Sequence, residues 1–109
     1  YQTAYFVVSA AELEQFELKT GDTEGLVNYA LNLTGIRFAA LIIDRTKLVK
    51  MSFRSKGQVP ANEFARTWFE GGGHFNAAGG QSSDTLETTE ARFLAALTEF
   101  APKILTAAN

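Results

Sequence analysis

The segment that most constrains the fold is the nearly apolar run from Ile36 to Ile43, which predicts a strand buried on both faces. A short turn follows at 44–46, and the stretch 47–55 then alternates between apolar and polar residues. The two strands are expected to pair as a hairpin. One face of the second strand is expected to pack in the core. The other face, which carries Lys50, Ser52 and Arg54, is expected to be free to bind a ligand.

The N-terminal segment predicts a strand and then a helix. Thr3 to Val8 is rich in β-branched and aromatic residues, which favours a strand. Ser9 and Glu12 have the spacing of a capping box, so a helix is expected to begin there and to turn Leu13 and Phe16 inward.

Two further helices are expected on either side of the hairpin. The first covers 24–33, after a polar loop at 19–24. The second begins at Pro60, which suits the first position of a helix, and ends at Glu70 before a run of glycines. Its core-facing stripe follows helical spacing and consists of Ala61, Phe64, Ala65, Trp68 and Phe69.

The C-terminal segment predicts a long helix that follows Asp84. Pro102 interrupts its hydrogen bonding, so a kink or break is expected near Phe100. Strands interspersed with helices indicate the α/β class. We expect a small mixed β-sheet with helices packed on it, in a single compact domain that spans residues 1–109.

Composition limits the function classes. A chain of 109 residues with 46% hydrophobic content fits one domain, and no run approaches the roughly 18 apolar residues that a membrane span needs. The absence of cysteine excludes disulfides and fits a cytoplasmic location. Because the chain starts with Tyr1 and not Met, we expect it to be a piece of a longer protein.

Basic residues are concentrated in the middle of the chain although the net charge is −2. Between Ile36 and Trp68 there are seven basic residues and two acidic ones. This distribution favours a small anionic ligand over a long polyanion. The alternative is a solvated basic surface without a ligand.

The glycine-rich segment 71–80 is the strongest functional signal. Gly71, Gly72 and Gly73 precede His74, which is the only histidine. Glycines let main-chain N–H groups approach a ligand, and a short helix is expected to open at His74, which together predict a phosphate site. The alternative is a helix cap followed by a turn.

The other candidate residues lie at the end of the second hairpin strand. Arg54 offers a charged fork for phosphate, Ser55 a hydroxyl donor and Lys56 a further charge, while Asn76 could bind a nucleobase. For Arg54 the alternative is a surface ion pair. We find neither a nucleophile–base pair nor a metal-binding motif in the sequence, so it predicts binding without catalysis.

Four motifs in order resemble a known family. They are Thr23 to Asn28, Val49 to Gly57, Asn62 to Ala65 and Gly71 to Gly80. Together they resemble the C-terminal, DHH-associated substrate-binding domain of DHH-family phosphoesterases, over essentially the whole chain.

The resemblance implies a hydrolase of two domains. An N-terminal domain with an Asp-His-His motif would hold manganese ions and would be the partner of this one. This chain has no such motif, so it is expected to hold no cofactor and to be inactive alone. By similarity, Arg54 and Ser55 would bind a substrate phosphate, and the glycine segment with His74 and Asn76 would bind the terminal nucleotide.

Several subgroups fit this resemblance. The spacing is most similar to the bifunctional oligoribonuclease and 3′-phosphoadenosine 5′-phosphate phosphatase group. Cyclic-dinucleotide phosphodiesterases and RecJ-like exonucleases are alternatives, while His74 departs from the related domain of alanyl-tRNA synthetases. A different class also fits, namely a single-stranded nucleic-acid-binding module whose stacking rings would be Tyr29, Phe53, Trp68 and Phe75.

Overall fold

A five-stranded sheet is built around the predicted hairpin. The computed structural model describes residues 1–106, and its strands follow the order β1-β2-β3-β5-β4. β1 runs parallel to β2, and every other neighbouring pair is antiparallel, so the sheet is mixed, as predicted. The strands are β1 (Thr3–Val8), β2 (Phe38–Asp44), β3 (Val49–Ser55), β4 (Gly72–His74) and β5 (Ala77–Ser82).

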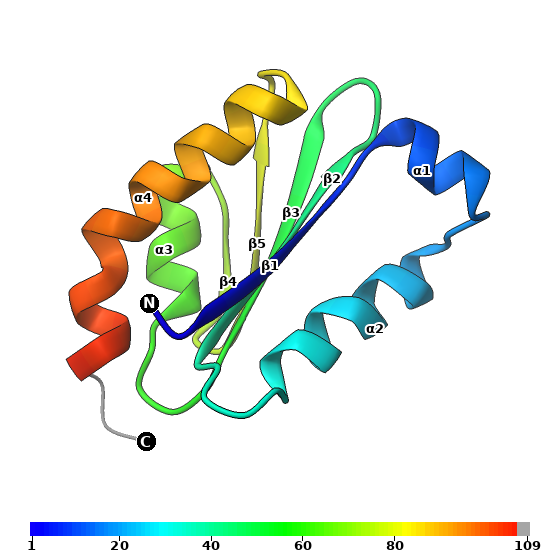
Figure 1. The fold of residues 1–109 in the computed structure, drawn as a ribbon. Helices are drawn as coiled ribbons and strands as arrows, with labels where there is room; N and C mark the ends of the chain where they lie inside the picture. The colour runs from blue at the N-terminus through cyan, green and yellow to red at the C-terminus, as the bar shows by residue number, and fades with distance from the viewer. Residues whose placement is uncertain (107–109) are drawn as a thin grey trace.

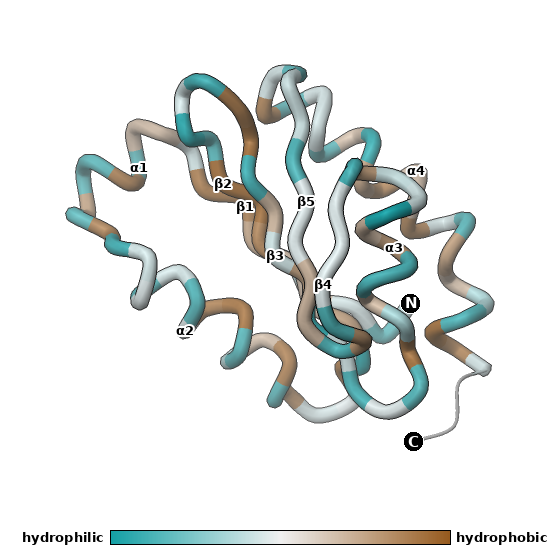
Figure 2. Tube along the Cα trace, turned by 180° about the vertical axis from the view of Figure 1, so that it is seen from behind, coloured by the Kyte–Doolittle hydropathy of each residue, from teal (hydrophilic) through white to brown (hydrophobic). Residues whose placement is uncertain are grey.

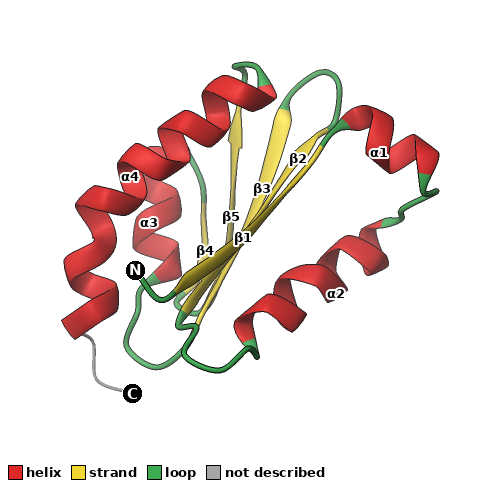
Figure 3. Ribbon diagram, in the orientation of Figure 1, coloured by secondary structure: helices red, strands yellow, loops and turns green. Residues whose placement is uncertain are grey.

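Four helices cover the sheet on both faces, which confirms the α/β class. α1 (Ala10–Gln15) and α2 (Thr20–Leu31) lie on one face, and α3 (Ala61–Trp68) and α4 (Leu86–Thr106) lie on the other (Figures 1 and 3). Within residues 1–106, no helix has the length and apolar character needed to cross a membrane.

The larger core lies between the sheet and the pair α3 and α4. It is rich in phenylalanine: β2 and β3 each contribute one buried ring from an alternating position, and the other rings come from α3, its C-terminal end and α4. The ring of Phe64 lies 5.0 Å from those of Phe53 and Phe100 and 5.1 Å from that of Phe38. Such aromatic pairs add to the stability that burial alone provides.

A smaller core lies beneath α2 on the opposite face. Val27 and Ala30 of α2 pack on the β2 residues Ala39, Leu41 and Ile43. Figure 2 shows the contrast along the sheet, because β1 and β2 are hydrophobic whereas β4 and β5 are pale. The hydrophobic core beneath α2 therefore ends near β3.

The helix boundaries differ from expectation at two N-terminal positions. The capping box at Ser9 and Glu12 is confirmed, but α1 ends at Gln15 and leaves Phe16 61% exposed, so its predicted burial is wrong. α2 begins at Thr20, inside the predicted loop. The carboxylate of Asp22 accepts a hydrogen bond from the N–H of Lys19 and so stabilises this early start.

The predicted helix at His74 is wrong, because this segment forms the hairpin of β4 and β5. Glycine and alanine carry little preference of their own, and pairing of β5 with β3 satisfies the backbone of this segment. Of the kink or break predicted near Phe100, the break is wrong, because α4 continues through Pro102 to Thr106. Figure 1 shows this helix curving along its length.

Candidate phosphate-binding face

α2 divides its face of the sheet into a covered half and an uncovered half. The covered half comprises β1 and β2. The other half, which we call the open face, is the same side of β3, β5 and β4, and α2 reaches only its β3 edge. Lys50 and Gln81 on this side are exposed, whereas Ile43 in the same row of β2 is buried.

Strand register places Arg54 and His74 in one row of the open face. Arg54 pairs with Ala77 of β5, and Ala77 pairs with His74 of β4. Directly paired residues point to the same side of a sheet, so only the methyl group of Ala77 separates the two candidate side chains. In the next row, Ser52 pairs with Gly79, so only a small side chain and a bare main chain cover the sheet there.

Arg54 is held in place by a carboxylate from α2. Its Nη2 lies 2.5 Å from Oε2 of Glu24, and its Nη1 donates to the carbonyl of Phe53 at 3.0 Å. Arg54 therefore forms an ion pair, which was the alternative to phosphate binding that the sequence left open. A guanidinium has five N–H donors, so these two printed bonds occupy only part of its capacity and fix its orientation.

Ser55 and Asn76 tie the hairpin turn to the end of β3. The buried hydroxyl of Ser55 donates to the carbonyl of Val59 at 2.6 Å. The amide of Asn76 donates to Ser55 Oγ at 2.9 Å and to the carbonyl of Gly57 at 3.1 Å. These contacts are internal to the protein, so both side chains position the loop that carries His74.

Close packing of the backbone explains three of the glycines. A Cβ at Gly71 would lie 1.9 Å from the carbonyl oxygen of Gly79, and one at Gly80 would lie 2.8 Å from Phe69 Cβ. Gly73 has a φ of +136°, in the region that favours glycine. Gly72 is different, because its Cβ would meet only Arg66 Cγ at 3.9 Å. Close contacts between main-chain atoms of neighbouring segments are therefore one reason why glycines occur here.

A shallow hollow of about 280 Å³ lies over the glycine backbone. Lys50, Gln81 and Glu70 line it together with Met51, Gly71, Gly79 and Gly80. Arg54 is not among these residues, because it lies four residues along β3 from Lys50, or about 13 Å at ~3.3 Å per residue. Arg54 and the glycines thus share a face but not this hollow.

The other predicted residues differ in accessibility. His74 is exposed, and Lys56 is half-buried without an ion pair among residues 1–106. Of the four proposed stacking rings, Phe53 is fully buried and Trp68 packs on the core, whereas Tyr29 and Phe75 are 65% and 42% exposed. Among these described residues, no group of three or more histidine, cysteine, aspartate or glutamate side chains could hold a metal ion.

Comparison with known families decides the identity of the chain. Residues 2–103 match the family model of the DHHA1 domain. The chain belongs to this family. The predicted resemblance to the DHH-associated domain of DHH-family phosphoesterases is therefore confirmed at the level of the family.

Solved structures share the fold of this DHHA1 domain. An exopolyphosphatase-related protein from Bacteroides fragilis is 33% identical with a TM-score of 0.86, over 95% of this chain and 31% of that one. The C-Ala domain of alanyl-tRNA synthetase from Aquifex aeolicus is 14% identical with a TM-score of 0.62, over 94% and 89%. A pGpG-specific phosphodiesterase from Vibrio cholerae is 16% identical with a TM-score of 0.55, over 70% and 27%. The last two similarities concern the fold alone.

The DHHA1 domain is short relative to two of these proteins. It spans about a third of the Bacteroides protein and about a quarter of the Vibrio phosphodiesterase. A search of curated protein sequences found no match to the chain.

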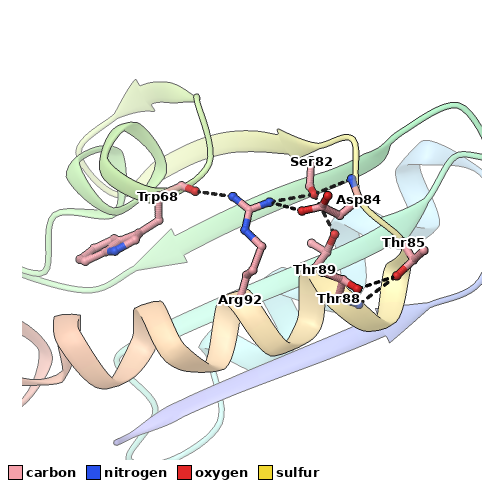
Figure 4. A network of polar contacts seen from close by, with 7 residues as sticks. All are labelled: Trp68, Ser82, Asp84, Thr85, Thr88, Thr89 and Arg92. Atoms are coloured by element: carbon pink, nitrogen blue, oxygen red, sulfur yellow. Dashed lines mark hydrogen bonds and ion pairs between the residues drawn. The ribbon is translucent and has the colours of Figure 1, made fainter.

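The sequence did not indicate the role of Arg92, which supports the hairpin of β4 and β5 from the face covered by α4. Arg92 of α4 donates to Asp84 Oδ2 at 2.8 Å, to Ser82 Oγ at 3.1 Å and to the carbonyl of Trp68 at 3.2 Å (Figure 4). Its guanidinium carbon also lies 5.1 Å from the centre of the Phe69 ring. Arg92 thereby joins the end of β5 to the ends of α3 and α4, and no local pattern in the sequence indicates this long-range role.

Proposed function

We propose that this DHHA1 domain is the substrate-binding part of a phosphoesterase that acts on short oligonucleotides or nucleotide phosphates. The observation that carries the proposal is the row Arg54, Ala77 and His74 across three strands of the open face. A fixed guanidinium and an imidazole on either side of a methyl group suit a phosphate and its attached nucleoside.

Each predicted residue has a role in this proposal. Arg54 binds phosphate with the N–H donors that its bonds to Glu24 and Phe53 leave, and Lys56, two residues further on, adds charge. His74, Gly73 and the partly exposed main chain of Gly71 and Gly72 contact the nucleotide. Ser55 and Asn76 hold the loop in place, since their polar atoms bond within the protein.

The hydrolytic chemistry belongs, in this proposal, to a DHH domain outside these 109 residues. Manganese ions bound there would supply the nucleophilic hydroxide and stabilise developing charge. The DHHA1 domain contributes positioning of the substrate. The oligoribonuclease and 3′-phosphoadenosine 5′-phosphate phosphatase group is the subgroup we favour, on the basis of its glycine–histidine spacing.

Calorimetric titration of the chain with adenosine 5′-monophosphate tests the proposal. Arg54→Gln is expected to weaken binding about tenfold, because it removes a charge-assisted hydrogen bond to phosphate. His74→Ala is expected to weaken binding of the nucleotide more than binding of inorganic phosphate. Arg45→Gln is the matched control, because Arg45 is exposed and lies in the turn at the opposite end of β3. Equal affinities for Arg54→Gln and the unchanged chain would overturn the role of Arg54.

A second candidate is a nucleic-acid-binding module without a hydrolytic role. The exposed rings of Tyr29 and Phe75 favour it, because exposed aromatic rings can stack on bases. Affinity that keeps increasing with oligonucleotide length and falls steeply with salt would support this module. Affinity that stops increasing after a few nucleotides would support the substrate-binding domain.

A further inference from the structure

We propose that the shallow hollow over the glycine backbone binds a guanine base. The proposal rests on the function proposed above. The first nucleotide of a short 5′-phosphorylated chain occupies the row of Arg54 and His74, and the hollow takes the base of the second nucleotide. Three residues of its lining carry polar side chains, namely Lys50, Glu70 and Gln81. Its volume of about 280 Å³ lies just below the usual range for small-molecule sites, which suits a single base.

The three polar side chains lie in a row across the open face. Lys50 of β3 pairs directly with Gln81 of β5. The N–H of Gln81 donates to the carbonyl of Phe69 at 3.0 Å, which brings the adjacent Glu70 to the other side of Gln81. Neighbouring strands are ~4.8 Å apart, so about 10 Å separates the backbones of Lys50 and Glu70. A planar base fits between this cation and this carboxylate, with hydrogen bonds at both ends of its edge.

None of these three side chains is used by the fold. All are exposed, and none makes a hydrogen bond or an ion pair with another of residues 1–106. Glu70 also has a φ of +48°, a conformation that glycine adopts more easily than a residue with a side chain. The backbone therefore gives no reason for a glutamate at this position, and its carboxylate remains available to a ligand.

The chemistry of the row selects guanine among the bases. The Watson–Crick edge of guanine places two donors, N1–H and the N2 amino group, beside the acceptor O6. A carboxylate only accepts hydrogen bonds and an ammonium group only donates them. Glu70 thus suits the two donors, while Lys50 suits O6. Adenine would turn its N1 acceptor to the carboxylate and its amino donor to the ammonium group, so it is rejected.

The position of the hollow fits the second nucleotide of the chain. The rows of Arg54 and Lys50 are about 13 Å apart at ~3.3 Å per residue, a distance that an extended dinucleotide covers from its 5′-phosphate to its second base. The phosphate that links the two nucleotides would then lie over the row between them. There Gly79 of β5 pairs with Gly72 of β4, so the main chain is bare. The bond to be hydrolysed therefore lies on the open face, where a facing domain has access to it.

Calorimetric titration of the chain with the dinucleotides pApG and pApA tests the proposal. The unchanged chain is expected to bind pApG about tenfold more tightly than pApA. Glu70→Gln is expected to abolish this difference, because the new amide also donates to adenine N1, and to leave the affinity for adenosine 5′-monophosphate unchanged. Glu14→Gln, which removes the same charge from an exposed site on α1, is the control and should retain the preference.

A second variant tests the other end of the row. Lys50→Gln is expected to weaken pApG binding about fivefold, because a neutral amide replaces the charged donor to O6, and to leave adenosine 5′-monophosphate binding unchanged. Lys19→Gln is the matched control, because Lys19 is exposed and precedes α2.

The remaining outcomes separate this proposal from the proposed function. Equal affinities for pApG and pApA, both weakened by Arg54→Gln, overturn the guanine site and leave the proposed function standing. A guanine preference that persists in both Glu70→Gln and Lys50→Gln overturns the assignment to the hollow. Equal losses of pApG and adenosine 5′-monophosphate affinity in Glu70→Gln would place the terminal nucleotide there and contradict the proposal. No binding of either dinucleotide at millimolar concentration overturns both.

Discussion

The two halves of the sheet on the side of α2 belong to one continuous hydrogen-bonded sheet but have contrasting surfaces. Leu41 of β2 and Ser52 of β3 are direct neighbours in one row, yet Leu41 is 1% exposed and lies beneath α2, whereas Ser52 is half-buried at the start of the open face. The difference lies in the side chains. Large apolar residues on β2 hold a helix over the sheet, while serine, glycine and alanine on β3 and β5 give α2 little to pack on.

The largest effect should come from truncation on the covered half. Leu41→Ala is expected to lower the free energy of unfolding by about 3 kcal/mol, because it leaves a cavity beneath α2. Its row neighbour Ser52→Ala should change the value by less than about 0.5 kcal/mol. Urea unfolding followed by circular dichroism measures both, and similar losses would contradict the division into halves.

Glycine-to-alanine substitutions compare the space for an added methyl group beside the sheet and on α2. Gly71→Ala is expected to lower the free energy of unfolding by about 2 kcal/mol, because its Cβ would overlap the carbonyl oxygen of Gly79. Gly25→Ala, in the interior of α2 with nothing within 4 Å, should raise it by roughly 0.5–1 kcal/mol. Thermal unfolding of the two variants gives the signs, and stabilisation by both would refute the proposed close packing.

The contact between the halves can be tested at Glu24. Glu24→Gln keeps a hydrogen-bond acceptor for Arg54 but removes the negative charge, so the affinity for adenosine 5′-monophosphate should rise by about 1 kcal/mol, or roughly fivefold. Glu14→Gln, at an exposed site on α1, is the control for net charge. A weaker affinity in Glu24→Gln would mean that orientation of Arg54 matters more than charge.

The smallest effect concerns Tyr5 of β1, whose side chain lies on the opposite face of the sheet, against α4. Its hydroxyl donates to Glu90 at 2.8 Å, and this bond and partial burial raise the pKa of Tyr5 above its usual value near 10. The bond stabilises the neutral phenol, so its contribution is present below pH 10 and is lost as the pH rises through the raised pKa. Tyr5→Phe should cost at most about 1 kcal/mol at pH 8, and the difference from the unchanged chain should shrink above pH 10 in urea unfolding. A difference that does not depend on pH would exclude this bond as its cause.

The sequence predicted those parts of the fold in which local pattern and burial agree. β3 and α3 carry strong periodicity, β2 is a nearly continuous apolar run, and the existence of all three is confirmed. The hairpin of β4 and β5 carries almost none, because glycine and alanine have no apolar side chain to mark a face. The early start of α2 was missed because Gly21 and Asp22 are typical of loops.

The sequence predicted which residue types belong to the candidate site, but it did not predict the contacts that they make. The alternation of β3 correctly placed Lys50, Ser52 and Arg54 on one face. Glu24 lies thirty residues from Arg54 in sequence, so spacing alone cannot indicate their ion pair. The burial of Ser55 likewise depends on the loop at Val59 and on Asn76, which only tertiary structure brings together.

The floor of the open face consists mainly of main chain, and this limits how its specificity can diverge. A larger side chain at Gly71 or Gly80 would disrupt the sheet before it could contact a new ligand. Variation that preserves the fold is therefore expected at the side chains around this floor, at positions such as Lys50, Lys56 and His74. Related domains can then acquire different substrates by exchanging a few peripheral side chains on an unchanged scaffold.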